Sequence, residues 1–297
     1  MKLEDLLSRA AQMEGKAVAV AQAEDEEVIE AVKAALDKRL AHFLLFGDEE
    51  KIRALLKEKD VKEDGIEVVA TSSKEMSAEM AVKSVRDKKA DVLMKGNIPT
   101  ATILKAVLNK EYGLRTGNVL SHVAVFEVPD YDRFIIVTDA AMNIAPDLQQ
   151  KAQILTNAVG IANAIGIKMP KVAPITAVET INPAMQATLD AAALSQMNKR
   201  GQIKNCIVDG PLALDNAVSM KAAEHKGIES EVAGQADILL VPVIEAGNIL
   251  YKSLIYFAKA KVGAVIAGAK APIVLTSRAD TAESKLYSLA LAICSSN

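Results

Sequence analysis

Short apolar runs alternate along the chain with longer segments whose apolar positions recur at helical spacing. The apolar runs are rich in β-branched residues and predict strands. These strands cover Ala17–Ala21, His42–Phe46, Glu67–Ala70, Asp91–Met94, Val119–Glu127, Arg133–Thr138, Lys171–Ala177, Asn205–Val208, Ile238–Val241, Val262–Ala267 and Ile273–Thr276. The segments between them predict helices, among them Glu26–Arg39, Glu49–Lys57, Ser77–Lys88, Thr100–Asn109, Asp147–Ile165, Pro183–Lys199 and Ala217–Glu224. The alternation predicts an α/β fold of mainly parallel strands joined by right-handed crossovers.

One pair of predicted strands breaks this rhythm. Val119–Glu127 and Arg133–Thr138 are separated only by Val128–Asp132, which contains Pro and Asp. So short a connection predicts an antiparallel hairpin, because parallel neighbours need a longer crossover. The change in sheet character predicts a domain boundary near residue 120.

Composition limits the class of protein. The chain has 297 residues, of which 51% are hydrophobic and 3% aromatic, and it contains no Trp. A core of Ala, Val, Ile, Leu and Met is typical of parallel sheets covered by helices, and this length suits two compact domains. The formal charge of −3 comes without a long basic stretch, so nucleic acid or an anionic membrane is not expected as the main partner.

The two cysteines and the N-terminus indicate the cellular compartment in which the protein is expected. Cys206 and Cys294 lie far apart and show no Cys-x-x-Cys spacing, so neither a disulfide framework nor a thiolate metal site is expected. Met1–Arg9 lacks an apolar signal core, and no apolar run reaches the roughly 18 residues of a membrane span. These features predict a cytoplasmic protein.

The first candidate site is the segment Met94–Thr100, where a buried strand ends in Lys95-Gly96 and a helix then begins near Pro99 or Thr100. Ligands of open α/β sheets bind at the carboxyl ends of strands, and helix N-termini favour anions. Lys95 and Gly96 are therefore candidates for phosphate binding. The alternative is an ordinary strand-to-helix turn with a solvated lysine.

Two further strand ends carry candidate polar groups. Arg115 precedes a glycine and is a candidate for a bidentate phosphate contact, with Ser121 and His122 following at the start of an apolar strand. Asp139 and Asn143 follow the strand Arg133–Thr138 and are candidates for substrate contact. Pro146 and Asp147 are explained as the first turn of a helix, whereas His122 fits a structural role better than a catalytic one.

Two other segments give weaker signals. Asp209 and Asp215 have the spacing for a shared metal, but no His, Cys or third acid accompanies them, and Asp215 also suits a helix N-cap. No metal site is therefore predicted. Glu245–Asn248 follows a strand as an apparent loop, in which Ala246 and Gly247 would allow a ligand, another chain or a packed neighbour to approach closely.

The strongest candidate is the segment Pro272–Lys285. Asp280 and Glu283 have the spacing of a capping box at the start of a helix. Ser277 and Arg278 then fall in the loop facing that helix N-terminus, where a hydroxyl, a guanidinium and unpaired N–H groups would form an anion or oxyanion site. Helix capping explains the two acids but not Ser277 and Arg278.

Taken together, these motifs resemble the phosphate acetyl/butyryltransferases, and most closely the butyryl-transferring members. The resemblance runs over nearly the whole chain. It is carried by Lys95-Gly96-Asn97, Arg115-Thr116-Gly117 with Ser121-His122, Thr138–Asp147, Asp209–Asn216, Asp237–Leu254 and Ser277–Lys285.

The resemblance implies a reversible reaction in which acyl-CoA and inorganic phosphate give acyl phosphate and coenzyme A, with butyryl as the expected acyl group. Coenzyme A enters as a substrate, and no tightly bound cofactor is implied. The implied fold has two α/β domains of the isocitrate/isopropylmalate dehydrogenase type with the active site in the cleft, here residues 1–120 with 270–297 and residues 121–269. A homo-oligomer is implied as well.

The resemblance also implies roles for individual residues. Ser277 would hydrogen-bond the reacting centre, and Arg278 would bind phosphate or polarise the carbonyl. Related enzymes use an aspartate as base for the coenzyme A thiol, but an ungapped count places Ser284 at that position. Glu283 is then the candidate base, with Asp280 second.

Two alternatives remain open at this level. The same fold serves metal- and NAD(P)-dependent decarboxylating dehydrogenases, which would need clustered acids that the sequence does not assemble. The chain could also be a non-catalytic sensor of acyl-CoA or acyl phosphate.

Overall fold

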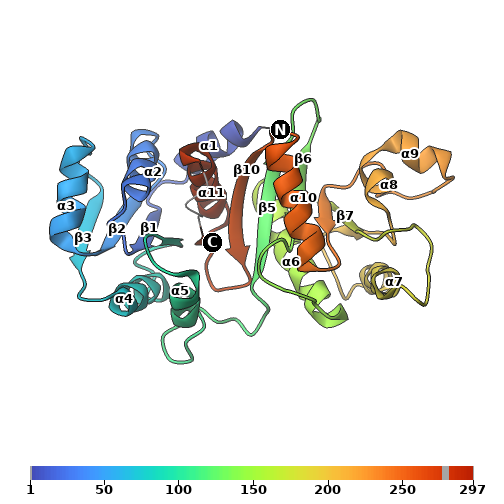
Figure 1. Ribbon diagram of the computed structural model, residues 1–297, viewed down its shortest axis with the longest axis horizontal. Coiled ribbons are helices and arrows are strands. Elements are labelled where there is room, and N and C mark those ends of the chain that lie inside the picture. Colours follow the sequence, from blue (N-terminus) through green and yellow to red (C-terminus); the bar gives the residue numbers. More distant parts are fainter. Residues whose placement is uncertain (1, 276–280, 297) are drawn as a thin grey trace. The chain divides into compact units, whose positions relative to one another are not determined.

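The computed structural model describes residues 2–275 and 281–296 (Figure 1). Its contacts divide the chain into two compact units. The first unit contains residues 2–118 and 263–297, and the second unit contains Val119–Val262. The domain boundaries drawn from the sequence, near residues 120 and 270, stay predictions of where independently folding parts begin and end.

The first unit contains a mixed sheet with the strand order β3-β2-β1-β4-β11-β10. Its strands are β1 (Ala17–Ala21), β2 (His42–Gly47), β3 (Ile66–Ala70), β4 (Val92–Lys95), β10 (Lys261–Ala267) and β11 (Ile273–Val274). Neighbours pair in parallel from β3 to β11, and only the β10–β11 pair is antiparallel. β1 is buried at four of its five positions, as expected of a parallel strand covered on both faces.

Helices cover both faces of this sheet. They are α1 (Leu3–Ala11), α2 (Glu26–Asp37), α3 (Glu49–Glu58), α4 (Lys74–Arg86), α5 (Thr100–Val107) and α11 (Ala282–Ser295). Figure 1 shows α4 and α5 on one side and the other helices of this unit on the opposite side. Asp25, Asp48 and Ser73 cap α2, α3 and α4 by accepting backbone N–H groups, which fixes where these helices begin.

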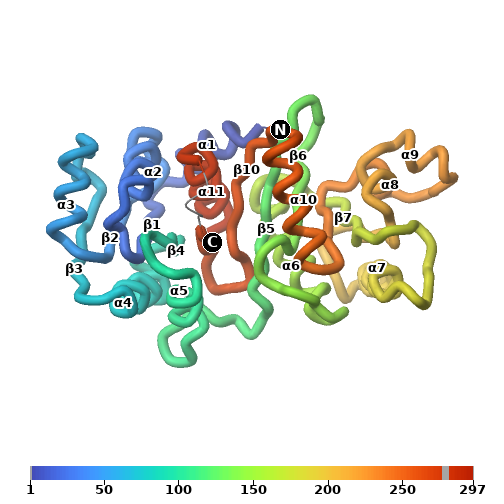
Figure 2. The backbone as a smooth tube through the Cα atoms, in the orientation of Figure 1, coloured from blue at the N-terminus to red at the C-terminus, as the bar shows by residue number. Residues whose placement is uncertain are grey.

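The helix α11 lies beside α1, although the two helices are far apart in the sequence. It packs against α1, and the two helices lie side by side in the tube view (Figure 2). The Tyr287 hydroxyl lies 3.3 Å from Glu4 Oε2. Every residue from Lys285 to Cys294 is buried, so this helix is an interior element of the first unit rather than a surface one.

The second unit confirms the predicted hairpin. Its strands are β5 (Ser121–Glu127), β6 (Phe134–Thr138), β7 (Lys171–Pro174), β8 (Ile207–Val208) and β9 (Ile238–Leu240), in the order β5-β6-β9-β7-β8. β5 and β6 pair antiparallel, with Ala124 opposite Val137. The remaining pairs in this unit are parallel.

The helices of the second unit correct three local expectations. They are α6 (Leu148–Ala164), α7 (Gln186–Lys199), α8 (Leu214–Val218), α9 (Met220–His225) and α10 (Ile244–Tyr256). Asp147 is the N-cap of α6, not a first-turn residue, because its side chain accepts the N–H of Gln150. Asp215 lies inside α8, whose N-cap is Ala213. The expected loop at Glu245–Asn248 is the first turns of α10.

The α/β class predicted from the pattern is confirmed. Within the described ranges, none of the helices combines the length and the apolar character needed to cross a membrane.

Candidate functional site

A pocket of about 270 Å³ lies in the first unit, where β1 and β4 end. It is lined by Asp25, Glu27, Val28, Lys74, Lys95, Gly96, Asn97, Ile98, Pro99, Thr100 and Lys285. Three helices contribute their N-terminal residues to this lining: α2, α4 and α5. Lys74, Lys95 and three helix N-termini around one pocket favour an anionic ligand, whereas Lys285 and Glu27 in the lining pair with each other.

The loop after β4 approaches β1 so closely that position 96 requires glycine. A Cβ atom at Gly96 would lie 2.1 Å from the carbonyl oxygen of Gln22. The N–H of Gly96 donates to the carbonyl of Ala21 at 2.8 Å, and the N–H of Asn97 donates to that of Gln22 at 2.7 Å. This approach places Lys95 and Gly96 in the pocket wall directly before α5. Their contact with phosphate stays a prediction.

An ion pair between a buried lysine and a half-exposed glutamate forms another part of the lining. Lys285 of α11 pairs with Glu27 in the first turn of α2, and the lysine side chain is only 4% exposed, whereas that of Glu27 is 52% exposed. A buried ammonium group needs a carboxylate partner, because removal from water otherwise costs several kcal/mol. The pair therefore brings together the two helices at the pocket.

The Ser277-Arg278 segment, like Asp280, lies outside the described residues. The strand before it is placed: Val274 of β11 stands opposite Met94, the residue before Lys95. The helix after it begins at Ala282 with Thr281 as its N-cap, because Thr281 Oγ1 accepts the N–H of Ser284 at 3.1 Å. The expected capping box of Asp280 and Glu283 was therefore wrong.

Glu283, the candidate base, lies in the first turn of α11. Its Oε1 accepts a hydrogen bond from the Tyr287 hydroxyl at 2.9 Å, and it is not among the residues that line the pocket. Its catalytic role stays a prediction.

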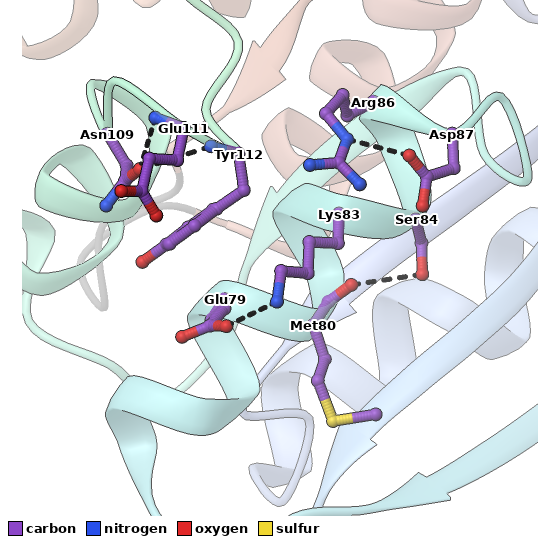
Figure 3. A network of polar contacts seen from close by, with 9 residues as sticks. All are labelled: Glu79, Met80, Lys83, Ser84, Arg86, Asp87, Asn109, Glu111 and Tyr112. Atoms are coloured by element: carbon purple, nitrogen blue, oxygen red, sulfur yellow. Dashed lines mark hydrogen bonds and ion pairs between the residues drawn. The ribbon is translucent and has the colours of Figure 1, made fainter.

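Arg115 is exposed in the loop that follows α5, and it is not among the lining residues of the pocket. The preceding residues are held against α4, as Figure 3 shows. Lys83 lies 5.2 Å above the Tyr112 ring, and Asn109 Oδ1 accepts the N–H groups of Glu111 and Tyr112 at 2.8 and 3.1 Å. The loop base is thus fixed while Arg115 itself is exposed, and its phosphate contact stays a prediction.

Ser121, Asp139 and Asn143 all lie in the second unit and make internal hydrogen bonds. The Asp139 carboxylate accepts the backbone N–H groups of Ala141, Met142 and Asn143 and the side-chain amide of Asn143. That amide also donates to the Leu120 carbonyl, and Ser121 accepts from Asn157. These bonds give the three residues a structural role in the second unit. Substrate contact by them stays a prediction.

The surroundings of Gly247 show what packs closely against the small residues of α10. A Cβ atom there would lie 2.7 Å from the carbonyl oxygen of Asp139 and 2.9 Å from the Cα of Ala140. The close approach is therefore a packing contact within the chain, which was one of the alternatives.

Neither cysteine is in a setting that favours reactivity. Burial raises the pKa of the Cys206 thiol to about 11 and raises that of Cys294 as well. Both thiols are therefore protonated near neutral pH and poor nucleophiles. Among the residues that the structure describes, His, Cys, Asp and Glu side chains form no group of three that could hold a metal ion.

The sequence motifs missed Glu27 and Lys74, and they gave Lys285 no role although it lies in the candidate segment Pro272–Lys285. The available signals were a lysine directly before the long, mainly apolar run of the helix 282–295 and an acid in the first turn of the helix that follows β1.

A comparison with protein-family models matches residues 2–84 and 69–293 to the phosphate acetyl/butaryl transferases. The chain belongs to this family. A family member from Bacillus subtilis (strain 168), a probable phosphate butyryltransferase, is 63% identical over 296 residues, which is 100% of this chain and 98% of that protein. The phosphate acetyltransferase of Thermotoga maritima is 48% identical over 291 residues, with 98% of each chain covered.

A solved structure in the family has the same fold. The branched-chain phosphotransacylase from Enterococcus faecalis V583 superimposes with a TM-score of 0.83 at 37% identity, covering 94% of this chain and 98% of that one. Membership in the phosphate acetyl/butaryl transferase family sets aside the dehydrogenase alternative.

Proposed function

We propose that this protein transfers a short acyl group reversibly between coenzyme A and inorganic phosphate, with butyryl as the preferred group. The observation that carries the proposal is the lysine-lined pocket at the ends of β1 and β4 in a chain of this family. Both substrates are anions, and the pocket offers Lys74 and Lys95 together with helix N-termini. The likeness to a probable phosphate butyryltransferase at 63% identity supports the choice of acyl group.

The proposed chemistry is acyl transfer through a tetrahedral intermediate, whose oxyanion needs hydrogen-bond donors. Ser277 and Arg278 supply these donors. Arg278, Lys95 and Arg115 bind the phosphate, because cationic donors make its strongest hydrogen bonds. Ser121, Asp139 and Asn143 belong to the proposal as residues that line or support the substrate site. The proposal also includes the finer fold assignment, which is two domains of the isocitrate/isopropylmalate dehydrogenase type with the active site in a cleft.

A phosphate-dependent thiol-release assay tests this function. Acetyl-, propionyl-, butyryl- and isobutyryl-CoA are each incubated with the protein, with and without phosphate. We expect release of coenzyme A only with phosphate, and the highest kcat/KM with butyryl-CoA. No release with any thioester would refute the activity and leave a sensor. A higher kcat/KM with acetyl-CoA would refute only the choice of acyl group.

We also propose that the protein is a homo-oligomer and that α10 lies in the contact. Of the α10 residues only Gly247 is buried, although the helix is rich in apolar side chains. Ile249 and Tyr256 are 65% exposed, and Phe257 just beyond the helix is 87% exposed. A second copy of the chain would remove this apolar surface from water.

Light scattering after size-exclusion chromatography tests the contact. We expect the mass of a dimer or larger assembly for the unmodified protein and of a monomer for the Ile249→Lys/Phe257→Lys double variant. A monomeric unmodified protein would refute the oligomer, and an unchanged mass for the variant would refute the role of α10.

A further inference from the structure

The ion pair between Lys285 and Glu27 has an arrangement that structural pairing alone does not require. The ammonium group is almost completely buried, but the carboxylate partner is half exposed and lines the pocket together with Lys95. One oxygen of Glu27, Oε2, accepts from Lys285. The pair thus presents a fixed carboxylate to the space in which the anionic substrates are proposed to bind.

The proposed function, on which this inference rests, needs such a group. A thiol has an ordinary pKa of about 8.5, and only the thiolate attacks a carbonyl carbon effectively. When acyl phosphate is converted to acyl-CoA, the thiol of coenzyme A must therefore lose its proton. A carboxylate near the sulfur can accept that proton as a general base, which contributes roughly 10²- to 10⁴-fold to the rate.

The other acids near the pocket are less well placed to meet a ligand. Asp25 is the second carboxylate in the lining, and it caps α2 by accepting the N–H of Val28 at 3.2 Å. Glu283 accepts from the Tyr287 hydroxyl and is absent from the lining. Glu27 is thus the carboxylate of the described residues best placed to act on a ligand in the pocket.

We propose that Glu27 is the catalytic base for the coenzyme A thiol and that Lys285 positions it. Glu27 accepts the thiol proton, and the sulfur forms a bond to the acyl carbon. The bond between that carbon and the phosphate oxygen then breaks. The proton passes from Glu27 to the departing phosphate, which leaves as hydrogen phosphate, so charge and protons balance. In the reverse direction Glu27 takes the proton from hydrogen phosphate and returns it to the sulfur.

The test compares Glu27→Gln with Glu26→Gln, which alters the neighbouring acid in the same helical turn. Glu26 pairs with Lys59 and does not line the pocket, so it controls for the charge at the N-terminus of α2. With butyryl phosphate and coenzyme A, we expect Glu27→Gln to lose at least about 100-fold in kcat. Glu26→Gln should stay within about twofold. Calorimetry should give the same coenzyme A affinity for both variants.

The pH profile separates loss of a base from loss of structure. Without Glu27, the reaction depends on thiolate formed in solution. The rate of Glu27→Gln should then rise about tenfold per pH unit between pH 6 and 8, below the thiol pKa. The unmodified enzyme should show a flatter profile. Parallel profiles would overturn the assignment.

A double variant controls for the effect of leaving Lys285 without its ion-pair partner. Glu27→Gln leaves Lys285 buried without its partner, which could itself disturb the pocket. Glu27→Gln/Lys285→Met removes both charges at similar volume. We expect this double variant to remain as inactive as Glu27→Gln. Recovery to within a few fold of the unmodified rate would show that the pair is only structural, and a larger loss in Glu283→Gln than in Glu27→Gln would assign the base to Glu283. Because the unmodified protein is assayed alongside, either result would leave the proposed function standing.

Discussion

Replacing Arg278 by alanine is expected to lower kcat by about 100- to 1,000-fold. The proposed role of its guanidinium is to donate to the developing oxyanion and to the phosphate, and both interactions strengthen as charge builds up on oxygen. Arg278→Lys should recover little of the loss, because an ammonium group lacks the planar fork that binds two oxygens at once. Initial rates with butyryl-CoA and phosphate measure the effect.

The control for this substitution is Arg53→Ala. Arg53 lies on the exposed face of α3, where it pairs with Glu49 and Glu63. It is not among the residues that line the pocket. Arg53→Ala should retain full turnover. If Arg278→Ala kept more than about a third of the activity, the assignment of Arg278 to catalysis would fail, even if the enzyme proved to be an acyltransferase.

Removing the carboxylate of Asp190 is expected to destabilise the second unit by about 3–5 kcal/mol. Lys151 of α6 and Asp190 of α7 form an ion pair of 2.6 Å, and their side chains are only 7% and 8% exposed. Asp190 also accepts from the amide of Gln186. Asp190→Ala leaves the lysine charge buried without compensation, which is the costly change. Urea denaturation followed by circular dichroism measures the free energy of unfolding.

A double variant that lacks both charges distinguishes the effect of an uncompensated buried charge from simple loss of packing. Lys151→Met/Asp190→Leu keeps most of the volume and removes both charges, so it should be much closer in stability to the unmodified protein than Asp190→Ala is. A loss below about 1 kcal/mol in Asp190→Ala would mean that water reaches Lys151 and that the pair contributes little.

The sequence predicted most of the strands because their signal is local. β1 was placed residue for residue, since a parallel strand covered on both faces must be continuously apolar. The hairpin of β5 and β6 followed from the five residues between the predicted strands. Capping was harder to predict. Asp280 and Thr281 are both good N-cap residues, and only the hydrogen bond from the N–H of Ser284 decides for Thr281.

Only part of the candidate site was predictable, because some of its residues lie far apart in the sequence. Lys95 and Gly96 are neighbours in sequence, at a strand end that any α/β fold uses for ligands. Glu27 and Lys285 are 258 residues apart, and no spacing rule connects them. Their pairing depends on α11 packing against α2, which is a property of the complete fold.

The order of strands in the first unit has a consequence for how the protein is made. β11 lies between β4 and β10 in the sheet, yet it follows both strands in the sequence and is therefore synthesised after them. Until it arrives, β4 presents an unpaired edge, and α1 lacks the helix that covers it. The pocket therefore depends on a segment synthesised long after β4, and a nascent chain that stops before residue 273 leaves that edge open to pairing with other chains.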